Sequence, residues 1–261
     1  MTISTTSQAS SRMLSVRLAS CKGDIEAAQK LRWNVFCAER GARLDQGSFG
    51  LDADPFDDVC DHLLVEDLAS GVPIVVGTYR LLRESIAQRH GGFYTAGEYI
   101  LESFPRSTDP HSELLELGRS CVAPAYRDAG TIQLLWRGIA SYLERYRISM
   151  MFGCASFHGT DPDEHADSLS YLFHNHLAPP HLRARALDRR HIEMARLPIG
   201  GYDPRLAMRK LPPLIKGYLR VGAMVGDGAV IDEPFNTVDV FMVMPVASIS
   251  ARYLGRFGVV A

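Results

Sequence analysis

The most informative stretch of this sequence is LLELGRSCVAPAYRDAG, residues 114–130. Its first part, Leu114 to Val122, has the pattern of a strand, and Gly130 opens a helix that we expect to continue to Tyr146. A strand, a short turn and a helix N-terminus leave backbone N–H groups available to an anion. We therefore predict that the turn binds a phosphate or a phosphopantetheine arm, with Arg127 adding a charge-assisted hydrogen bond. A plain helix cap is the alternative interpretation of these residues.

A helix and a strand follow this turn. The helix carries apolar residues on one face, at the spacing of an amphipathic helix: Ile132, Leu135, Trp136, Ile139 and Leu143. The next segment, Ile148 to Ser156, is short and almost continuously apolar, which is typical of a central strand buried on both faces.

In the N-terminal part, the sequence predicts a strand and a helix before an acidic loop and two strands after it. We expect strands at Leu14–Leu18, His62–Asp67 and Pro73–Leu82. The helix should end at Gly41. The loop that follows it is dense in carboxylates: Asp45, Asp52, Asp54, Asp57, Asp58 and Asp61. The composition from Arg83 to Ser112 predicts a long functional loop with a short helix at most.

The last third predicts three helices and one strand. The helices are expected at Glu164–Leu177, Leu214–Met224 and Ser248–Phe257, and the strand at Thr237–Met244. Residues 1–12 have the pattern of a disordered leader. We expect residues 13–261 to form a single α/β domain with a C-terminal elaboration.

Composition excludes several classes of protein. Lys and Arg number 28 against 30 Asp and Glu, a net charge of -2, which does not indicate nucleic-acid binding. No apolar run is long enough for a membrane span, and the N-terminus does not have the pattern of a signal peptide. The five cysteines are odd in number and widely spaced, so we expect neither disulfides nor a zinc site. These features predict a cytoplasmic protein without a metal.

Several motifs resemble known acyltransferases. The turn at Arg127 and Gly130 is similar to the acyl-donor loop of GNAT N-acyltransferases, although Ile132 replaces the last small residue of that pattern. Four further motifs occur in the order seen in acyl-homoserine-lactone synthases: Arg32-x-x-Val35-Phe36, Asp54-x-Phe56-Asp57, Gly77 to Leu82 and Glu116-Leu117-Gly118-Arg119. Five runs resemble the bacterial L-ornithine N-alpha-acyltransferases of ornithine-lipid synthesis more closely: Cys60–Val65, Glu116–Val122, Phe152–Phe157, Leu211–Arg220 and Phe235–Val240.

The resemblance implies a fold and a reaction. The expected fold is a GNAT-like α/β domain, with a mixed central sheet flanked by helices. The expected reaction moves a 3-hydroxyacyl chain from acyl carrier protein to the α-amine of L-ornithine, giving a lyso-ornithine lipid. The chain would reach the enzyme on the carrier's 4'-phosphopantetheine, and no bound cofactor would be required.

The resemblance also implies roles for individual residues. Glu116 would be the general base, directly or through a water, beside Arg119. In a regular strand Arg119 would project to the opposite face, so a direct pair with Glu116 would require a bulge. Residues expected to bind the amino acid are Arg32, Phe36, Asp54, Asp57 and Arg80; those expected to contact the acyl donor are Val122, Arg127, Gly130 and Ser156. In this arrangement the aspartates suit the ammonium groups, and Arg32 or Arg80 suits the carboxylate.

Other interpretations stay open at this point. An acyl-homoserine-lactone synthase, or an N-acyl amino acid synthase of different specificity, would share most of these motifs. A non-catalytic protein that binds acyl chains or acyl carrier protein is a further alternative. Basic residues between Arg183 and Lys210 would suit acidic acyl carrier protein, or an anionic membrane surface at the inner membrane face, or neither. His174 and His176 lack the further ligands that a zinc site requires.

Overall fold

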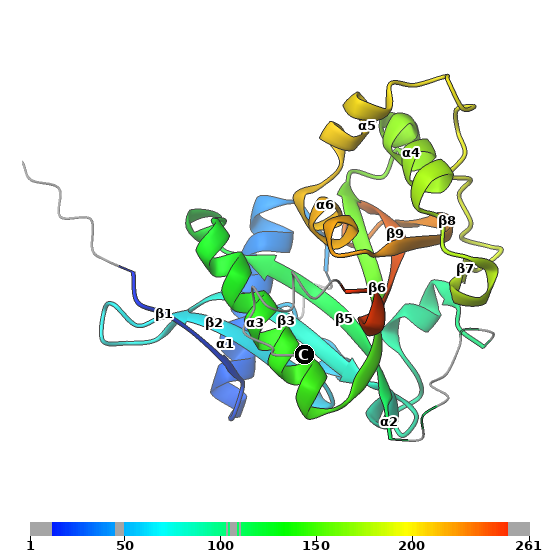
Figure 1. Ribbon diagram of the computed structural model, residues 1–261. Helices are drawn as coiled ribbons and strands as arrows, with labels where there is room; N and C mark the ends of the chain where they lie inside the picture. Colours follow the sequence, from blue (N-terminus) through cyan, green and yellow to red (C-terminus); the bar gives the residue numbers. More distant parts are fainter. Residues whose placement is uncertain (1–11, 45–49, 103, 105–108, 110, 250–261) are drawn as a thin grey trace, which may run out of the picture.

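The computed structural model describes residues 12–44, 50–102, 104, 109 and 111–249 (Figure 1). A mixed sheet runs through the molecule in the order β1-β2-β3-β5-β6-β9-β8-β7-β4. Its strands are β1 (Leu14–Leu18), β2 (Asp61–Asp67), β3 (Ile74–Arg83), β4 (Tyr99–Ile100), β5 (Glu113–Val122), β6 (Ile148–His158), β7 (Arg185–Ala186), β8 (Met224–Asp232) and β9 (Thr237–Pro245). Helices flank this sheet, which confirms the predicted fold class.

Six α-helices are described along the chain. They are α1 (Lys22–Trp33), α2 (Glu84–Ala87), α3 (Ala129–Arg145), α4 (Ala166–His176), α5 (Pro204–Lys210) and α6 (Pro213–Arg220). A π-helical segment, Asn34–Glu39, extends α1. Helix α3 begins because Asp128 caps it, accepting a hydrogen bond from the Thr131 amide. None of the helices in the described ranges is both long enough and apolar enough to span a bilayer.

Strands β5 and β6 are parallel and pair over only a few residues. The ladder joins Glu113–Glu116 to Ile148–Phe152, and beyond it β5 pairs only with β3 while β6 pairs with β9. The two strands therefore diverge after Glu116 and Phe152. Gly153 lies at this point of divergence, and a Cβ there would come 2.2 Å from the Leu117 carbonyl oxygen. The close approach of the two backbones explains why glycine occupies this position.

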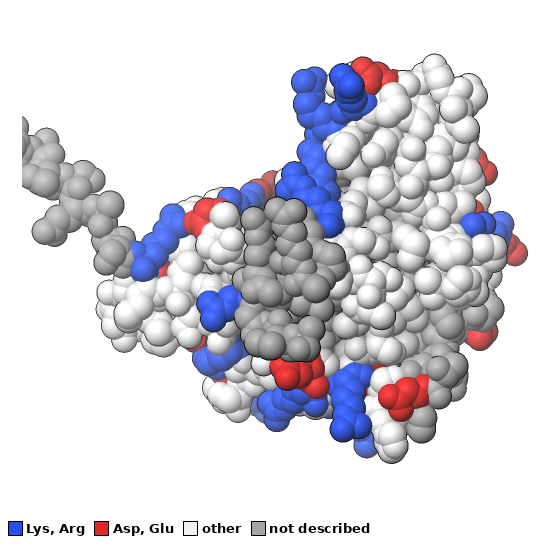
Figure 2. Space-filling view, in the orientation of Figure 1, with Lys and Arg blue, Asp and Glu red and all other residues white. Residues whose placement is uncertain are grey.

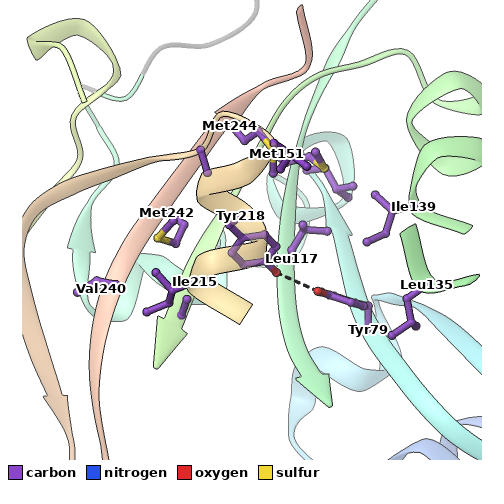
Figure 3. Packing of buried hydrophobic residues seen from close by; sticks show 14 of the residues in the cluster. Tyr79, Leu117, Leu135, Ile139, Met151, Ile215, Tyr218, Val240, Met242 and Met244 are labelled. Carbon is purple, nitrogen blue, oxygen red and sulfur yellow. Dashed lines mark hydrogen bonds between the residues drawn. The ribbon is translucent and has the colours of Figure 1, made fainter. Parts of the chain in front are cut away.

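The main core lies between the sheet and helices α3, α4 and α6. Leu135 and Ile139 of α3 pack over Leu63 and Val65 of β2, which buries the apolar stripe that the sequence predicted. Helix α6 enters the same core beside the diverging strands, where Tyr218 and Tyr79 of β3 point toward one another with their hydroxyls 3.1 Å apart (Figure 3). A hydrogen bond between two buried hydroxyls satisfies both and fixes the position of α6.

The opposite face of the sheet carries α1 and the loop from α2 to β5. Aromatic rings from this loop pack on the sheet, with Phe93 and Phe104 against Phe152 at centroid distances of 4.8 and 5.3 Å. Phe241 of β9 joins the same cluster. The long loop predicted for residues 83–112 therefore contributes to a second core rather than lying free on the surface.

The structure differs from the predicted elements in three notable places, the first of which is helix α5, which was not predicted. Strand β8 was not predicted, and the helix predicted at Leu214–Met224 ends at Arg220 because Gly222, with φ of +98°, turns the chain into β8. The closing helix at Ser248–Phe257 and the leader at residues 1–12 fall almost entirely outside the described residues. The division into a leader and a single domain at 13–261 therefore stays a prediction.

We predict that Gly153→Ala destabilises the protein by about 1–3 kcal/mol or more, because the new methyl group would overlap the Leu117 carbonyl. Urea unfolding followed by circular dichroism measures this loss. Gly217→Ala in α6 is the matched control, since a Cβ at Gly217 meets no atom within 4 Å. Equal stability of the two variants would contradict the proposed close approach of β5 and β6.

Candidate active site

A bulge in β5 orients the first site residue. Thr78 and Arg80 of β3 pair with Cys121 and Gly118, so β5 has one more residue than β3 over this interval. Arg119 lies in the extra segment with φ of +50°, in the left-handed region that only glycine adopts easily. Its guanidinium consequently stacks 4.8 Å from the ring centre of Tyr94, on the face of the sheet toward which Glu116 also points. A regular strand would have sent it to the other face.

Three arginines and three aspartates form a buried network below this bulge. We call it the arginine–aspartate network: Arg32, Arg80, Arg119, Asp52, Asp54 and Asp57. Arg32 of α1 is fully buried and binds Asp52 at 2.9 Å and Asp57 at 2.7 Å. Burial alone would raise the pKa of Asp57, but hydrogen bonds and charge from Arg32 hold it below its ordinary value.

The other two arginines complete the network. Arg80 binds Asp54 at 2.6 Å and Asp57 at 3.2 Å, and Arg119 binds Asp52 at 3.2 Å and Asp54 at 3.0 Å. Asp54 also caps the short 3-10 helix Pro55–Asp58, which fixes the acidic loop in place. The three positive and three negative charges balance, so the aspartates that the sequence assigned to substrate ammonium groups are already neutralised by arginines.

Glu116 is fully engaged as a hydrogen-bond acceptor. One carboxylate oxygen accepts the Tyr94 amide at 2.9 Å, and the other accepts the Thr95 amide at 2.6 Å and the Thr95 hydroxyl. Burial raises the pKa of Glu116, although these hydrogen bonds oppose the shift. Glu116 thus fixes the 3-10 helix Tyr94–Gly97 against β5, and its role as the base stays a prediction. The structure gives Glu116 no ion pair with Arg119.

A second group of carboxylates lies beside this site and was not predicted. Glu98 follows the 3-10 helix, Asp232 ends β8 and Asp239 lies on β9; one carboxylate oxygen from each lies within 4.8 Å of the other two. We call these residues the acidic triad. All three are no more than 8% exposed. Burial and mutual repulsion raise the pKa of Glu98 to about 7 and that of Asp239 to about 6.

The acidic triad has fewer positive partners than acidic groups. Arg190 approaches Glu98 at 3.3 Å, and Asp232 accepts the Phe235 amide at 3.2 Å. Asp239 Oδ1 is buried without a hydrogen-bond partner among the described residues. Two features of the sequence are consistent with a site at the acidic triad. Glu98 belongs to the loop predicted to be functional, and Asp239 belongs to the run Phe235–Val240.

An apolar pocket opens where β5 and β6 diverge. Its lining comes from both strands, from β9 and from α6: Leu117, Met151, Phe152, Gly153, Cys154, Tyr218, Ala223, Met242 and Met244. Figure 3 shows Leu117, Met151 and Met244 gathered around Tyr218. Cys154 joins this pocket to the acidic triad, because its Sγ donates to Glu98 Oε2 at 3.3 Å. Cys154 therefore lies between the two: the pocket is on the face of the sheet that α6 covers, and the acidic triad is on the opposite face.

The predicted donor turn is organised by contacts within the protein. Arg127 forms a two-pronged ion pair with Glu39 at 2.6 and 2.7 Å and donates to the Val122 carbonyl at 3.1 Å. These contacts use three of the five N–H donors of Arg127. Beside Gly130, the Asp128 side chain occupies the start of α3. The donor-binding roles of these residues stay predictions.

The remaining predicted residues lie around the charged site. Phe36 packs edge-on against Phe235 at 5.8 Å, and Phe235 lies 4.4 Å from the Arg119 guanidinium. Ser156 is the register partner of Asp239, so it belongs to the neighbourhood of the acidic triad. Within the described ranges, the acidic triad is the group whose side chains are close enough to hold a metal ion.

We predict that Asp239→Asn gains stability over the wild type as the pH rises from about 4 to about 7. In the folded wild type the pKa of Asp239 is raised from its ordinary 3.8 to about 6. The protonated carboxyl therefore stabilises the wild-type folded state below about pH 4, and this contribution is lost as the carboxyl ionises at higher pH. The hydroxyls of Thr237 and Ser156 and the charges of Asp232 and Arg119 also act on this carboxyl. Glu98 titrates together with Asp239, so the difference between variant and wild type reports on this pair. Urea unfolding at several pH values measures the difference; a pH-independent difference would contradict the prediction.

Comparison with known proteins identifies the family. An acetyltransferase (GNAT) domain model matches residues 31–137. The chain is 49% identical over 250 residues to an L-ornithine N(alpha)-acyltransferase of Brucella abortus, covering 94% of this chain and 89% of the relative. It is 44% identical to the protein of the same name from Rhizobium meliloti, covering 94% and 84%.

Solved structures show the same fold at low sequence identity. The acyl-homoserine lactone synthase BjaI superposes with a TM-score of 0.52 and 14% identity, covering 94% of this chain and 87% of BjaI. FeeM, an N-acyl amino acid synthase from uncultured soil microbes, has a TM-score of 0.50 and 10% identity, covering 91% and 94%. The fold is thus shared with these synthases, and by sequence the chain belongs to the L-ornithine N(alpha)-acyltransferase family of GNAT enzymes.

Proposed function

We propose that this enzyme transfers a 3-hydroxyacyl chain from acyl carrier protein to the α-amine of L-ornithine, forming a lyso-ornithine lipid. The observation that carries the proposal is the junction at Cys154, where an apolar pocket meets a buried site rich in carboxylates. The apolar lining of the first suits a fatty tail, for which the pocket, about 10 Å³ in this structure, would have to widen. An amino acid with two ammonium groups suits the second. The family relatives named for acylation of ornithine support the same acceptor.

The reaction requires one proton acceptor and one oxyanion site. The deprotonated α-amine attacks the thioester carbonyl, the carbon–sulfur bond breaks, and the carrier thiol leaves with a proton. Glu116, directly or through a water, is our proposed acceptor of the amine proton. Backbone amides of β5 and β6 beyond Glu116 and Phe152 are the proposed oxyanion donors, because the ladder between these strands ends there.

The acyl chain would occupy the apolar pocket between the diverging strands. Met151, Met242 and Met244 line it, and methionine side chains adapt easily to a flexible tail. Tyr218 also lines the pocket, from near the end of the segment Leu211–Arg220 that resembles the family. The hydrogen bond to Tyr79 holds the Tyr218 side chain in place.

Acyl carrier protein is the proposed donor and partner. Four of the basic residues predicted to form a patch already have carboxylate partners. Arg185 binds Asp188 and Asp227, Arg190 binds Glu98, Arg196 binds Asp163 and Lys210 binds Asp167. Lys and Arg side chains nevertheless gather over α5 and α6 on the face that Figure 2 shows. These two helices contain five basic residues and no acidic one: Arg205, Arg209, Lys210, Lys216 and Arg220. This surface suits an acidic carrier and adjoins the pocket through α6.

We predict that purified enzyme releases free carrier thiol from 3-hydroxyacyl carrier protein when L-ornithine is supplied, with acetyl-CoA a poor donor. Thiol release and mass spectrometry of the lipid product measure the reaction. A panel of neutral and acidic amino acids serves as the acceptor control. Equal rates with acetyl-CoA would contradict the donor assignment, and thiol release with none of the acceptors would favour a protein that only binds acyl chains.

We predict that Glu116→Gln lowers kcat by roughly 100- to 10,000-fold, the usual contribution of a general base. The matched control is Glu113→Gln on the same strand, because Glu113 also accepts a backbone amide, from Ser85 at 2.9 Å. If Glu116 accepts the proton, the acidic limb of the plot of kcat/KM against pH disappears in the Glu116→Gln variant. If both variants lose similar activity and keep the wild-type pH profile, Glu116 only positions the Tyr94–Gly97 helix.

A further inference from the structure

Negative charges outnumber positive charges at the candidate active site. The arginine–aspartate network contains three arginines and three aspartates that bind one another. The acidic triad adds three buried carboxylates, and the direct ion pair within it is the one between Glu98 and Arg190. Carboxylates buried without partners are costly unless a ligand or a proton neutralises them. The excess of negative charge therefore lies at the acidic triad and not at Asp54 or Asp57.

One atom of the triad lacks any partner of its own. Asp239 is 7% exposed, and its Oδ1 makes no hydrogen bond within the described part of the chain. Buried acceptors of this kind are rare in folded proteins and usually face a ligand, an ion or a water. The neighbouring hydroxyls of Thr237 and Ser156 lower the pKa of Asp239 by hydrogen bonding and so compensate part of its charge. A donor from outside the protein would complete the hydrogen bonding of Oδ1.

The position of the triad relates it to the acyl pocket. Cys154 lines the pocket and donates to Glu98, and Ser156, two residues farther along β6, pairs in register with Asp239. An amino acid whose side chain ends at the triad would therefore extend toward the point where β5 and β6 diverge. Its reactive end would lie near Arg119, whose positive charge lowers the pKa of Asp239 and suits an α-carboxylate.

We infer that Glu98, Asp232 and Asp239 form the subsite that holds the side-chain ammonium group of the acceptor amino acid. This inference rests on the proposed function and names the feature that selects a basic acceptor. An ammonium group has three N–H donors and matches three converging carboxylates. Negative neighbours also hold an amine in its protonated, non-nucleophilic form. The subsite would thus direct acylation to the α-amine and protect the side-chain amine.

The test compares L-ornithine with L-norvaline, which has the same carbon chain without the side-chain amine. In the Asp239→Asn and Asp232→Asn variants, kcat/KM for ornithine should fall roughly 10- to 100-fold, the value of a charge-assisted hydrogen bond. The rate with norvaline should not change. Asp58→Asn, which removes an exposed carboxylate from the acidic loop, is the matched control and should keep the wild-type preference. Equal losses for both amino acids, or an unchanged preference, would overturn the inference.

Calorimetric binding distinguishes failure of the subsite from failure of the proposed function. Wild-type protein that binds ornithine more tightly than norvaline, with the difference lost in Asp239→Asn, supports the subsite even if no acyl transfer occurs. Turnover of ornithine by wild type and variant with the same preference rejects the subsite and leaves the proposed function standing. A divalent cation, Mg²⁺ or Ca²⁺, that raises the melting temperature of the wild type but not of Asp239→Asn would make the triad a metal site and overturn the ammonium assignment.

Discussion

Three guanidinium groups and three aspartates, packed together below the β5 bulge, hold the candidate active site of this enzyme in place. Burying an isolated charge is costly, so each member of the arginine–aspartate network is stabilised by its partners. Through Arg32 the network ties α1 to the loop at residues 52–58, and through Arg80 and Arg119 it ties that loop to β3 and β5. The left-handed backbone of Arg119 is tolerated because these ion pairs and the ring of Tyr94 compensate for it.

Glu116 extends this organisation to the neighbouring loop. By accepting the amides of Tyr94 and Thr95, it fixes a 3-10 helix whose next residue is Glu98. The acidic triad can form only because this helix, the end of β8 and the middle of β9 meet at one place. The arginine–aspartate network, whose charges balance, lies next to the acidic triad, which has an excess of negative charge. The two ends of the site therefore differ: arginines at one end suit a carboxylate, and carboxylates at the other suit an ammonium group.

Periodicity predicted the regular elements and missed the irregular ones. Helix α3 and strands β2, β5 and β6 were predicted because their apolar residues repeat at helical or strand spacing. Strand β8 was missed because Gly226, Asp227 and Gly228 are unfavourable in strands. Tertiary contacts account for both glycines: a Cβ at Gly226 would come 2.6 Å from the Ala184 carbonyl, and one at Gly228 would come 2.4 Å from His191. Packing of this kind is invisible in a local pattern.

The sequence alone was sufficient for the family, the fold class and most of the residues that gather at the site, because short motifs and apolar spacing are local properties of the chain. Only the tertiary structure decided how those residues pair. Asp54 and Asp57, which are predicted to bind the substrate, form ion pairs with Arg80 and Arg32, because partners 26 and 25 residues apart in sequence meet through folding. The acidic triad joins Glu98 to residues more than a hundred positions away, and long-range proximity between charges has no signature in the order of residues.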